Sequence, residues 1–517
     1  MGWNTGGSTS KKYKLYLFLV IAVALALRLI GIGHGFPFIF NPDEPALVRS
    51  ALGLRFDLNP GHFDWPHLFF YLNYFLYMGF AKMRGLLELS SIRNSLPAIV
   101  WDDNLVFYLI SRIFAAFLGA LTVIPVFMAA RKMFGEKCGF ISALVFAFIP
   151  FHVLHSHYAL IDVPMTFFLA WALYFSARIY VDGTFKDYGF AGLFVGLSSS
   201  TKYNGALGIL FIVLASIHRI LSAKEKVPAI KRTLVALGLS GLLCIAAFVA
   251  GTPFSVLDYD TFLRTDGPQG ALWQFRNVGK VGIPDQFRQF LQMSVKVHPS
   301  NLGVTFWMLY VAGFFYVLTR MRREVEGKKV MYVYVLSVFF FLYVSGFEKT
   351  RSHYFMVAYP VFALAVGYII DLILTKVSSK RLRAIILFLV FLSPLAASLD
   401  RSLIFVKKDT RVQMYEWLKR NVSTDDVLVY EGYEGEALDP VFTSELMKNA
   451  VKKSKSINLQ ELLSTTGYLI LSNNGDNFVT VEGKRIELPV EPVEVILNDG
   501  RRGPVIEIFR LPLASYD

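Results

Sequence analysis

The sequence predicts a polytopic α-helical membrane protein with a small C-terminal α/β domain. Of the 517 residues, 54% are apolar, and the mean hydropathy is +0.47, which is too apolar for a large soluble core. Long apolar runs recur up to residue 399, and short alternating runs replace them from residue 400. Most of the formal net charge of +13 falls in short linkers between the apolar runs. This placement indicates membrane topology and not a nucleic-acid partner.

About eleven apolar segments are near the length needed to cross hydrocarbon. They lie at about 14–32, 105–130, 138–157, 160–180, 187–201, 204–220, 233–251, 302–320, 330–346, 353–373 and 382–399. Residues 1–13 are expected to form a cytoplasmic tail, and residues 14–399 the transmembrane domain, with outer loops at about 33–103 and 252–300. With an odd number of spans, the Lys- and Arg-rich linkers share the cytoplasmic side, and the long loops and the C-terminus lie outside.

Residues 400–517 are expected to form the extracytoplasmic α/β domain. Short apolar runs now alternate with polar stretches, as at Val427–Tyr430, Tyr468–Leu471 and Val505–Ile508, which indicates strands. Helical patterns lie between them at 412–420 and 459–463. The segment is long enough to have its own core.

An acidic segment follows the first apolar run. Asp43 and Glu44 stand between Pro42 and Pro45, and the prolines favour a turn over a regular ladder of hydrogen bonds. Carboxylates at the edge of hydrocarbon are costly unless they face protein, water or a ligand. For an isolated acidic pair, a solvated loop with a helix N-cap is the better explanation.

Three further polar clusters lie at the predicted outer ends of spans. They are residues 152–158 followed by Asp162, residues 198–204 with Lys202, and residues 348–354 with Arg351. Taken singly, they are explained by helix capping, a snorkelling lysine and a surface ion pair. Taken together, they bring carboxylates and cations from distant stretches to one membrane face. A lipid phosphate needs such cations, and an acceptor hydroxyl needs a carboxylate beside it.

Histidines and carboxylates also leave a metal site open. Asp43, His155, His157 and Asp162 have side chains that bind divalent ions, although their spacing matches no known signature. No cofactor is required by the pattern, and a divalent metal ion remains an alternative.

Several short motifs occur together in a recognisable order. They are Pro42-Asp43-Glu44, Trp65-Pro66 with Phe69-Phe70-Tyr71, residues 157–164, residues 196–203, and Arg351-Ser352-His353-Tyr354 leading to Tyr359-Pro360. In this order, the chain resembles the GT-C superfamily of membrane glycosyltransferases, in particular glycosyltransferase family 39, the protein O-mannosyltransferase and aminoarabinose-transferase-like group. The resemblance covers most of residues 14–420.

The resemblance implies an inverting glycosyltransferase that takes a sugar from a polyprenyl (dolichyl or undecaprenyl) monophosphate. In the family the acidic residue of the first outer loop is the base, which corresponds to Asp43, and Glu44 matches the second acid. The acceptor hydroxyl is left open between a glycan, a lipid and a protein. The chain lacks an obvious inserted β-trefoil domain, which puts a protein acceptor in doubt.

Each candidate residue then receives an expected role. Catalytic roles fall to Asp43, Glu44 and Asp162; donor phosphate binding to Lys202, Tyr203, Arg351, His353 and Tyr354; and substrate binding to Trp65, His157 and Tyr158. The expected location is the plasma membrane of a prokaryote rather than the endoplasmic reticulum, with the active site extracytoplasmic. The alternative is a transporter of a lipid-linked or anionic substrate, whose charges should lie near the bilayer centre in repeated halves.

Overall fold

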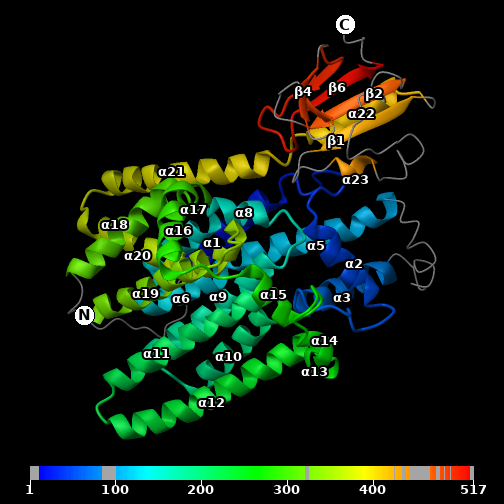
Figure 1. Cartoon of the computed structure of the whole chain (residues 1–517). Helices are drawn as coiled ribbons and strands as arrows, with labels where there is room; N and C mark the ends of the chain where they lie inside the picture. Colours follow the sequence, from blue (N-terminus) through cyan, green and yellow to red (C-terminus); the bar gives the residue numbers. More distant parts are fainter. Residues whose placement is uncertain are drawn as a thin grey trace. The chain divides into compact units, whose positions relative to one another are not determined.

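The described residues of the computed structural model form two compact units (Figure 1). The membrane unit comprises those within Met1–Leu29, Ala46–Leu87 and Ile110–Arg401, and the C-terminal unit those within Ile30–Pro45, Glu88–Leu109 and Ser402–Asp517. The structure describes residues 11–83, 101–320, 325–423, 426–432, 438–442, 466–472, 478–481, 484–488 and 491–512.

The membrane unit is built from long apolar helices, as the sequence predicts. They are α1 (Lys11–Leu29), α5 (Trp101–Leu121), α6 (Val123–Phe134), α7 (Glu136–Ala147), α8 (Pro150–His155), α9 (Asp162–Val181), α10 (Phe185–Ser199), α11 (Ile209–Ser222), α12 (Lys226–Gly251), α18 (Val304–Arg320), α19 (Val325–Ser345), α20 (Tyr359–Lys376) and α21 (Lys380–Leu403). Within the described ranges, six stretches are long and apolar enough to cross a membrane. The count of eleven spans therefore stays a prediction.

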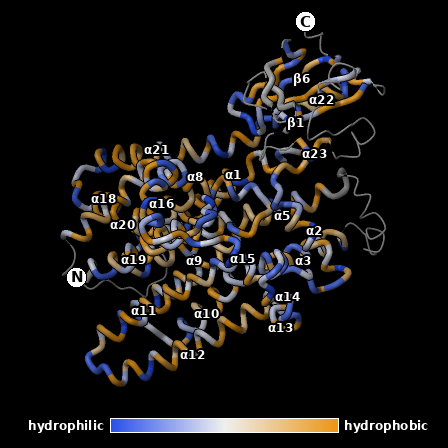
Figure 2. The backbone as a smooth tube through the Cα atoms, in the orientation of Figure 1, coloured by the Kyte–Doolittle hydropathy of each residue, from blue (hydrophilic) through white to orange (hydrophobic). Residues whose placement is uncertain are grey.

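Two of these helices show that the unit belongs in lipid. Only 22% of the most apolar window of α12 and 11% of that of α21 is buried inside the protein. Figure 2 shows long hydrophobic stretches along both helices. So much exposed apolar surface is stable only against hydrocarbon.

Several predicted spans are interrupted. The segment 138–157 is not one helix, because α7 ends at Ala147 and α8 begins at Pro150, whose missing N–H suits the first turn of a new helix. Short 3₁₀ helices, η1 (Tyr203–Gly208) and η2 (Ser352–Ala358), precede α11 and α20. The predicted outer loop 252–300 contains short helices: α13 (Phe254–Leu257), α14 (Tyr259–Phe262), α15 (Ala271–Val278), α16 (Ile283–Lys296) and α17 (His298–Leu302).

The C-terminal unit contains a mixed four-stranded sheet in the order β1-β2-β6-β5. Strands β1 and β2 are parallel, and β6 is antiparallel to both β2 and β5. The elements are α22 (Thr410–Asn421), β1 (Val427–Gly432), α23 (Asp439–Phe442), β2 (Gly467–Ser472), β5 (Glu494–Ile496) and β6 (Ile506–Leu511), with a separate hairpin of β3 (Phe478–Val481) and β4 (Lys484–Glu487). The three predicted strands are confirmed as β1, β2 and β6, and the helix at 412–420 as α22. The helix predicted at 459–463 lies outside the described residues.

Alternation along the strands explains the two sides of this sheet. Tyr468 and Ile470 of β2 join the core beneath α22, whereas Leu469 and Leu471 face a second apolar cluster. The core beneath α22 also takes in Phe38, which comes from the segment Ile30–Pro45. This segment therefore folds as part of the C-terminal unit.

The stretch between α2 (Asp43–Gly53) and α3 (Leu68–Met83) is fastened to the turn after α10. The Tyr203 hydroxyl donates to the Phe63 carbonyl at 2.8 Å. The Leu68 N–H donates to the Ser200 carbonyl at 3.0 Å. The His67 N–H donates to the Thr252 hydroxyl at 3.2 Å. These contacts hold the loop that contains Trp65 against the segment that carries Lys202.

His67 predicts an acid-sensitive fold at this loop. Burial lowers the pKa of His67 from 6.5 to about 4. Between these two pH values, His67 is protonated in the unfolded chain but neutral in the folded protein. Stability is then lost as the pH falls from 6.5 towards 4, by up to about 3 kcal/mol. His67→Gln keeps a donor for the His62 carbonyl and should lessen the fall of the thermal midpoint over that range. Equal pH dependence in the variant and the unchanged protein would contradict this account.

Candidate active site

A buried ion pair joins two of the predicted polar clusters. Asp162 opens α9, and Lys202 precedes η1. The Lys202 ammonium donates to the Asp162 carboxylate at 2.6 Å, and the two side chains are only 14% and 6% exposed. The sequence analysis gave these residues separate roles, because they lie forty positions apart and their contact is not visible in the sequence. The structure makes them one unit.

Aromatic and imidazole rings from the other clusters surround the pair. The Lys202 ammonium lies 5.1 Å from the ring centre of Tyr354. The rings of His155 and His353 are 5.7 Å apart, and both histidines interact electrostatically with Asp162. Residues from α8, α9, the turn before η1, and η2 therefore meet at one place. The Lys202 ammonium is therefore partly desolvated, and Asp162 and the Tyr354 ring fix its position.

Arg351 lies at the edge of this group. It immediately precedes η2, and its side chain is exposed. It is near enough to influence His353 electrostatically. Within the described part of the chain, it forms no ion pair with Glu348, the partner expected if it were only a surface residue.

The three histidines of residues 152–157 point to different partners. His152 accepts from Arg28 at 3.1 Å, His155 lies beside His353, and His157 Nδ1 lies 2.9 Å from the Val153 carbonyl oxygen. Over the described ranges, no three His, Cys, Asp or Glu side chains are grouped to hold a metal ion. Lys202 already supplies the cation at Asp162, so the residues present here do not fit a metal centre.

The predicted substrate-binding residues lie at different depths. His157 and Tyr158 are buried, whereas Trp65 is half-buried, with its ring 6.3 Å from that of Phe70. The ring of Tyr203 is tilted against that of Phe275, with ring centres 5.6 Å apart, and the Tyr203 hydroxyl donates to the Phe63 carbonyl. Tyr203 therefore shapes the turn around Lys202.

Asp43 and Glu44 begin α2 in the C-terminal unit. Asp43 is exposed, and its N–H donates to the Asn41 side chain at 3.0 Å, whereas Glu44 is fully buried. The preceding segment packs on α22, since the ring of Phe38 lies 5.1 Å from that of Tyr415, and the Arg411 guanidinium lies 3.7 Å above Phe40.

Two arginines emerge from the structure that the sequence did not single out as functional. Arg28 is fully buried and donates to the carbonyls of Ala24 and Ala147 as well as to His152, which ties α1 to α8. The guanidinium nitrogens of Arg55 are buried and have no hydrogen-bond partner among the described residues. The sequence could have indicated this burial, because Arg55 stands between the apolar residues Leu54 and Phe56, and arginine is rarely buried unless it is paired.

Comparison with known proteins supports the resemblance. The family model described as dolichyl-phosphate-mannose-protein mannosyltransferase matches residues 108–250, a range that contains both Asp162 and Lys202. Dolichyl-phosphate-mannose–protein mannosyltransferase 1 of Saccharomyces cerevisiae is 28% identical over 191 residues, which is 35% of this chain and 22% of that protein. The chain thus matches about a fifth of this curated relative's length.

Two solved structures share the fold over most of the chain. ArnT from Cupriavidus metallidurans, bound to undecaprenyl phosphate, has a TM-score of 0.50 at 13% identity and covers 98% of this chain and 100% of its own. The Archaeoglobus fulgidus oligosaccharyltransferase tethered with an acceptor peptide has a TM-score of 0.51 at 11% identity, with 89% and 69% covered. The chain is therefore similar in fold to these two membrane proteins and, over residues 108–250, similar in sequence to the mannosyltransferase family.

Proposed function

We propose that this protein is an inverting glycosyltransferase that moves a sugar from a polyprenyl monophosphate donor to an acceptor hydroxyl. The observation that carries the proposal is the buried Lys202–Asp162 pair beside His155 and His353, within a fold shared with lipid-phosphate-dependent enzymes. A lysine oriented in this way offers a lipid phosphate a positive group whose position is already set.

The transfer step is a single displacement at the anomeric carbon. The acceptor oxygen attacks that carbon while the bond from the carbon to the phosphate oxygen breaks, and the lipid phosphate leaves as an anion. The acceptor proton passes to Asp43. Lys202 and Arg351 stabilise the negative charge that grows on the leaving phosphate, and no acid is needed on that side.

The remaining residues take supporting roles. Asp162 holds the Lys202 ammonium in position, and the polar edges of His353 and Tyr354 complete the donor phosphate site together with the Tyr203 turn. Glu44 assists at the acidic segment, and Trp65, His157 and Tyr158 line the path of the substrate. The reaction requires no metal.

The orientation follows from the distribution of charge. Lys- and Arg-rich linkers favour the cytoplasm, which puts the acidic segment and the C-terminal unit outside. The enzyme then acts at the outer leaflet of a prokaryotic plasma membrane. Its partners are the lipid-linked donor and a glycan, lipid or protein acceptor.

Arg55 extends this proposal to a second cation. The Arg55 guanidinium lies 4.2 Å over the Phe56 ring, but its nitrogens have no hydrogen-bond partner among the described residues. A phosphate oxygen would supply charge-assisted hydrogen bonds there. We assign Arg55 to the binding of an anionic group of the lipid donor.

Asp43→Asn should reduce transfer by about a hundredfold or more, because the amide cannot accept the proton. The assay uses protein reconstituted in membranes with short-chain polyprenyl-phosphate-linked sugars, and measures the release of polyprenyl phosphate. Asp260→Asn, another exposed aspartate on an outer segment, is the control and should retain full activity. Normal turnover by Asp43→Asn would remove Asp43 from the role, and no release by the unchanged protein from any donor sugar would refute the proposed function.

Lys202→Met should lower both stability and donor use. The change leaves Asp162 buried without its partner, which typically costs about 3–5 kcal/mol. The double variant Lys202→Met/Asp162→Asn removes that unpaired charge and should recover the thermal midpoint, while the KM for the donor stays raised at least about tenfold. If the double variant also recovers donor use, Lys202 has a structural role only.

Arg55→Gln should separate binding from stability. The change removes a guanidinium that lacks hydrogen-bond partners but lies over the Phe56 ring, so the thermal midpoint of the free protein should change little. The rise of the midpoint on adding short-chain polyprenyl phosphate should become smaller, because that rise reports affinity. Arg49→Gln, an exposed change on α2, is the matched control. An unchanged rise in Arg55→Gln would exclude Arg55 from the phosphate site.

A further inference from the structure

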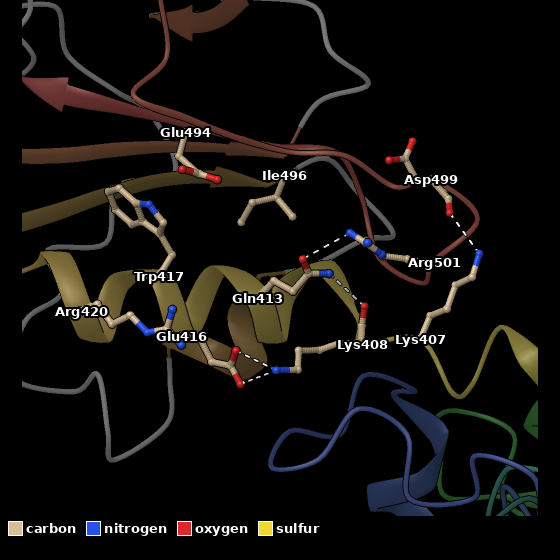
Figure 3. Close-up of a pocket in the computed structure, with 10 residues that line it drawn as sticks. All are labelled: Lys407, Lys408, Gln413, Glu416, Trp417, Arg420, Glu494, Ile496, Asp499 and Arg501. Atoms are coloured by element: carbon tan, nitrogen blue, oxygen red, sulfur yellow. Dashed lines mark hydrogen bonds and ion pairs between the residues drawn. The ribbon is translucent and has the colours of Figure 1, made fainter.

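A cavity of about 540 Å³ opens in the C-terminal unit, away from the residues assigned to catalysis. Figure 3 shows α22 along one side, β5 along the other, and the turn after β5 closing one end. Gln413, Glu416, Trp417 and Arg420 line it from α22, and their spacing puts them on one helix face. The remaining lining residues are Lys407, Lys408, Glu494, Ile496, Asp499 and Arg501.

One end of the cavity combines an aromatic ring with an available carboxylate. Trp417 is held edge-on to Tyr468, with ring centres 5.4 Å apart, and Ile496 supplies a buried apolar floor. Glu494 stands two residues before Ile496 on β5 and therefore faces the same side. Within the described residues, its carboxylate has neither a hydrogen bond nor an ion pair. A flat apolar face next to a free acceptor suits a ring that carries hydroxyl groups.

The other end presents positive charge that neighbouring carboxylates do not neutralise by contact. The Lys407 ammonium donates to the main-chain oxygen of Asp499 at 3.3 Å. Arg501 donates to the Gln413 side-chain oxygen at 3.3 Å. Both acceptors are uncharged. Gln413 is held in turn, because its amide donates to the Lys408 carbonyl at 3.1 Å.

The ion pair in the cavity lies elsewhere on its wall. Lys408 contacts both carboxylate oxygens of Glu416 at 2.8 Å, so these two charges cancel locally. Counting all lining residues, four cations face three carboxylates. The cavity thus has an aromatic and acidic end, and an end where Lys407 and Arg501 can receive an anion (Figure 3).

We propose that this cavity binds a saccharide that carries an anionic group, either a phosphate or a carboxylate. The sugar ring lies against Trp417, and its hydroxyls donate to Glu494. The anionic group accepts hydrogen bonds from Arg501 and Lys407, whose charge strengthens them. The volume falls within the range of small-molecule sites, which combine apolar walls with a few directed polar groups.

The position of α22 suggests what this binding serves. Its other side supports the segment before Asp43, through Tyr415 against Phe38 and Arg411 over Phe40. A saccharide bound on α22 would therefore sit one helix away from the acidic segment, as suits part of an acceptor. This role rests on the proposed function, whereas the binding itself does not.

The test is calorimetric titration of the full-length protein in detergent with four probes. They are glucose 6-phosphate, glucuronic acid, glucose and inorganic phosphate. Both anionic sugars should bind. Glucose lacks the anionic group and phosphate lacks the sugar ring, so each should bind at least about tenfold more weakly. Equal binding of phosphate and glucose 6-phosphate would mean a simple anion patch and would overturn the proposal, as would no binding of either anionic sugar.

Variants locate the site and separate it from catalysis. Glu494→Gln and Arg501→Gln should each weaken binding of glucose 6-phosphate at least about tenfold. Lys419→Gln, which removes a charge from the same helix outside the cavity, should leave it unchanged. If neither cavity variant weakens binding, the sugar binds elsewhere and the proposal is wrong. Release of polyprenyl phosphate is measured in parallel. Release without saccharide binding would refute this proposal alone, and saccharide binding without release would refute the transferase assignment alone.

Discussion

The pairing of Lys202 with Asp162 is the constraint on which the centre of the membrane unit depends. Removing an ammonium and a carboxylate from water is costly, and their mutual attraction offsets that cost only at close range. At 2.6 Å the contact fixes the start of α9 against the turn before η1. The lysine can therefore serve a second anion only because its position is already determined.

Irregular backbone gathers around this pair. The chain breaks before α8, and the 3₁₀ turns η1 and η2 begin the helical stretches that continue as α11 and α20. Within a membrane protein, non-helical backbone is tolerated where it is covered by protein or lines a polar space. His155 and His353 reach the pair from two of these interruptions. The deviations from simple spans therefore mark the site, and the straight helices α12 and α21 face lipid.

Much of the fold follows from patterns that the sequence displays. Hydropathy predicts the long helices because hydrocarbon selects for apolar length. Short apolar runs predict β1, β2 and β6 because both faces of the sheet are covered. The short strand β5 and the hairpin β3–β4 were missed, since three or four residues are too few to show a period. The partner of Lys202 could not be read from the chain, because contact between positions forty apart depends on how helices pack. The burial of Arg55 is likewise a tertiary property.

The C-terminal unit contributes more than an outer domain attached to the last helix. Its helix α22 has two functional faces, since residues spaced three and four apart line the cavity, while Arg411 and Tyr415 hold Phe40 and Phe38. Phe40 lies only three positions before Asp43. The segment that ends in the proposed base is thus ordered by side chains of α22, which lies far along the chain from it. Under the two proposals made above, acceptor binding and proton removal would belong to one folded unit.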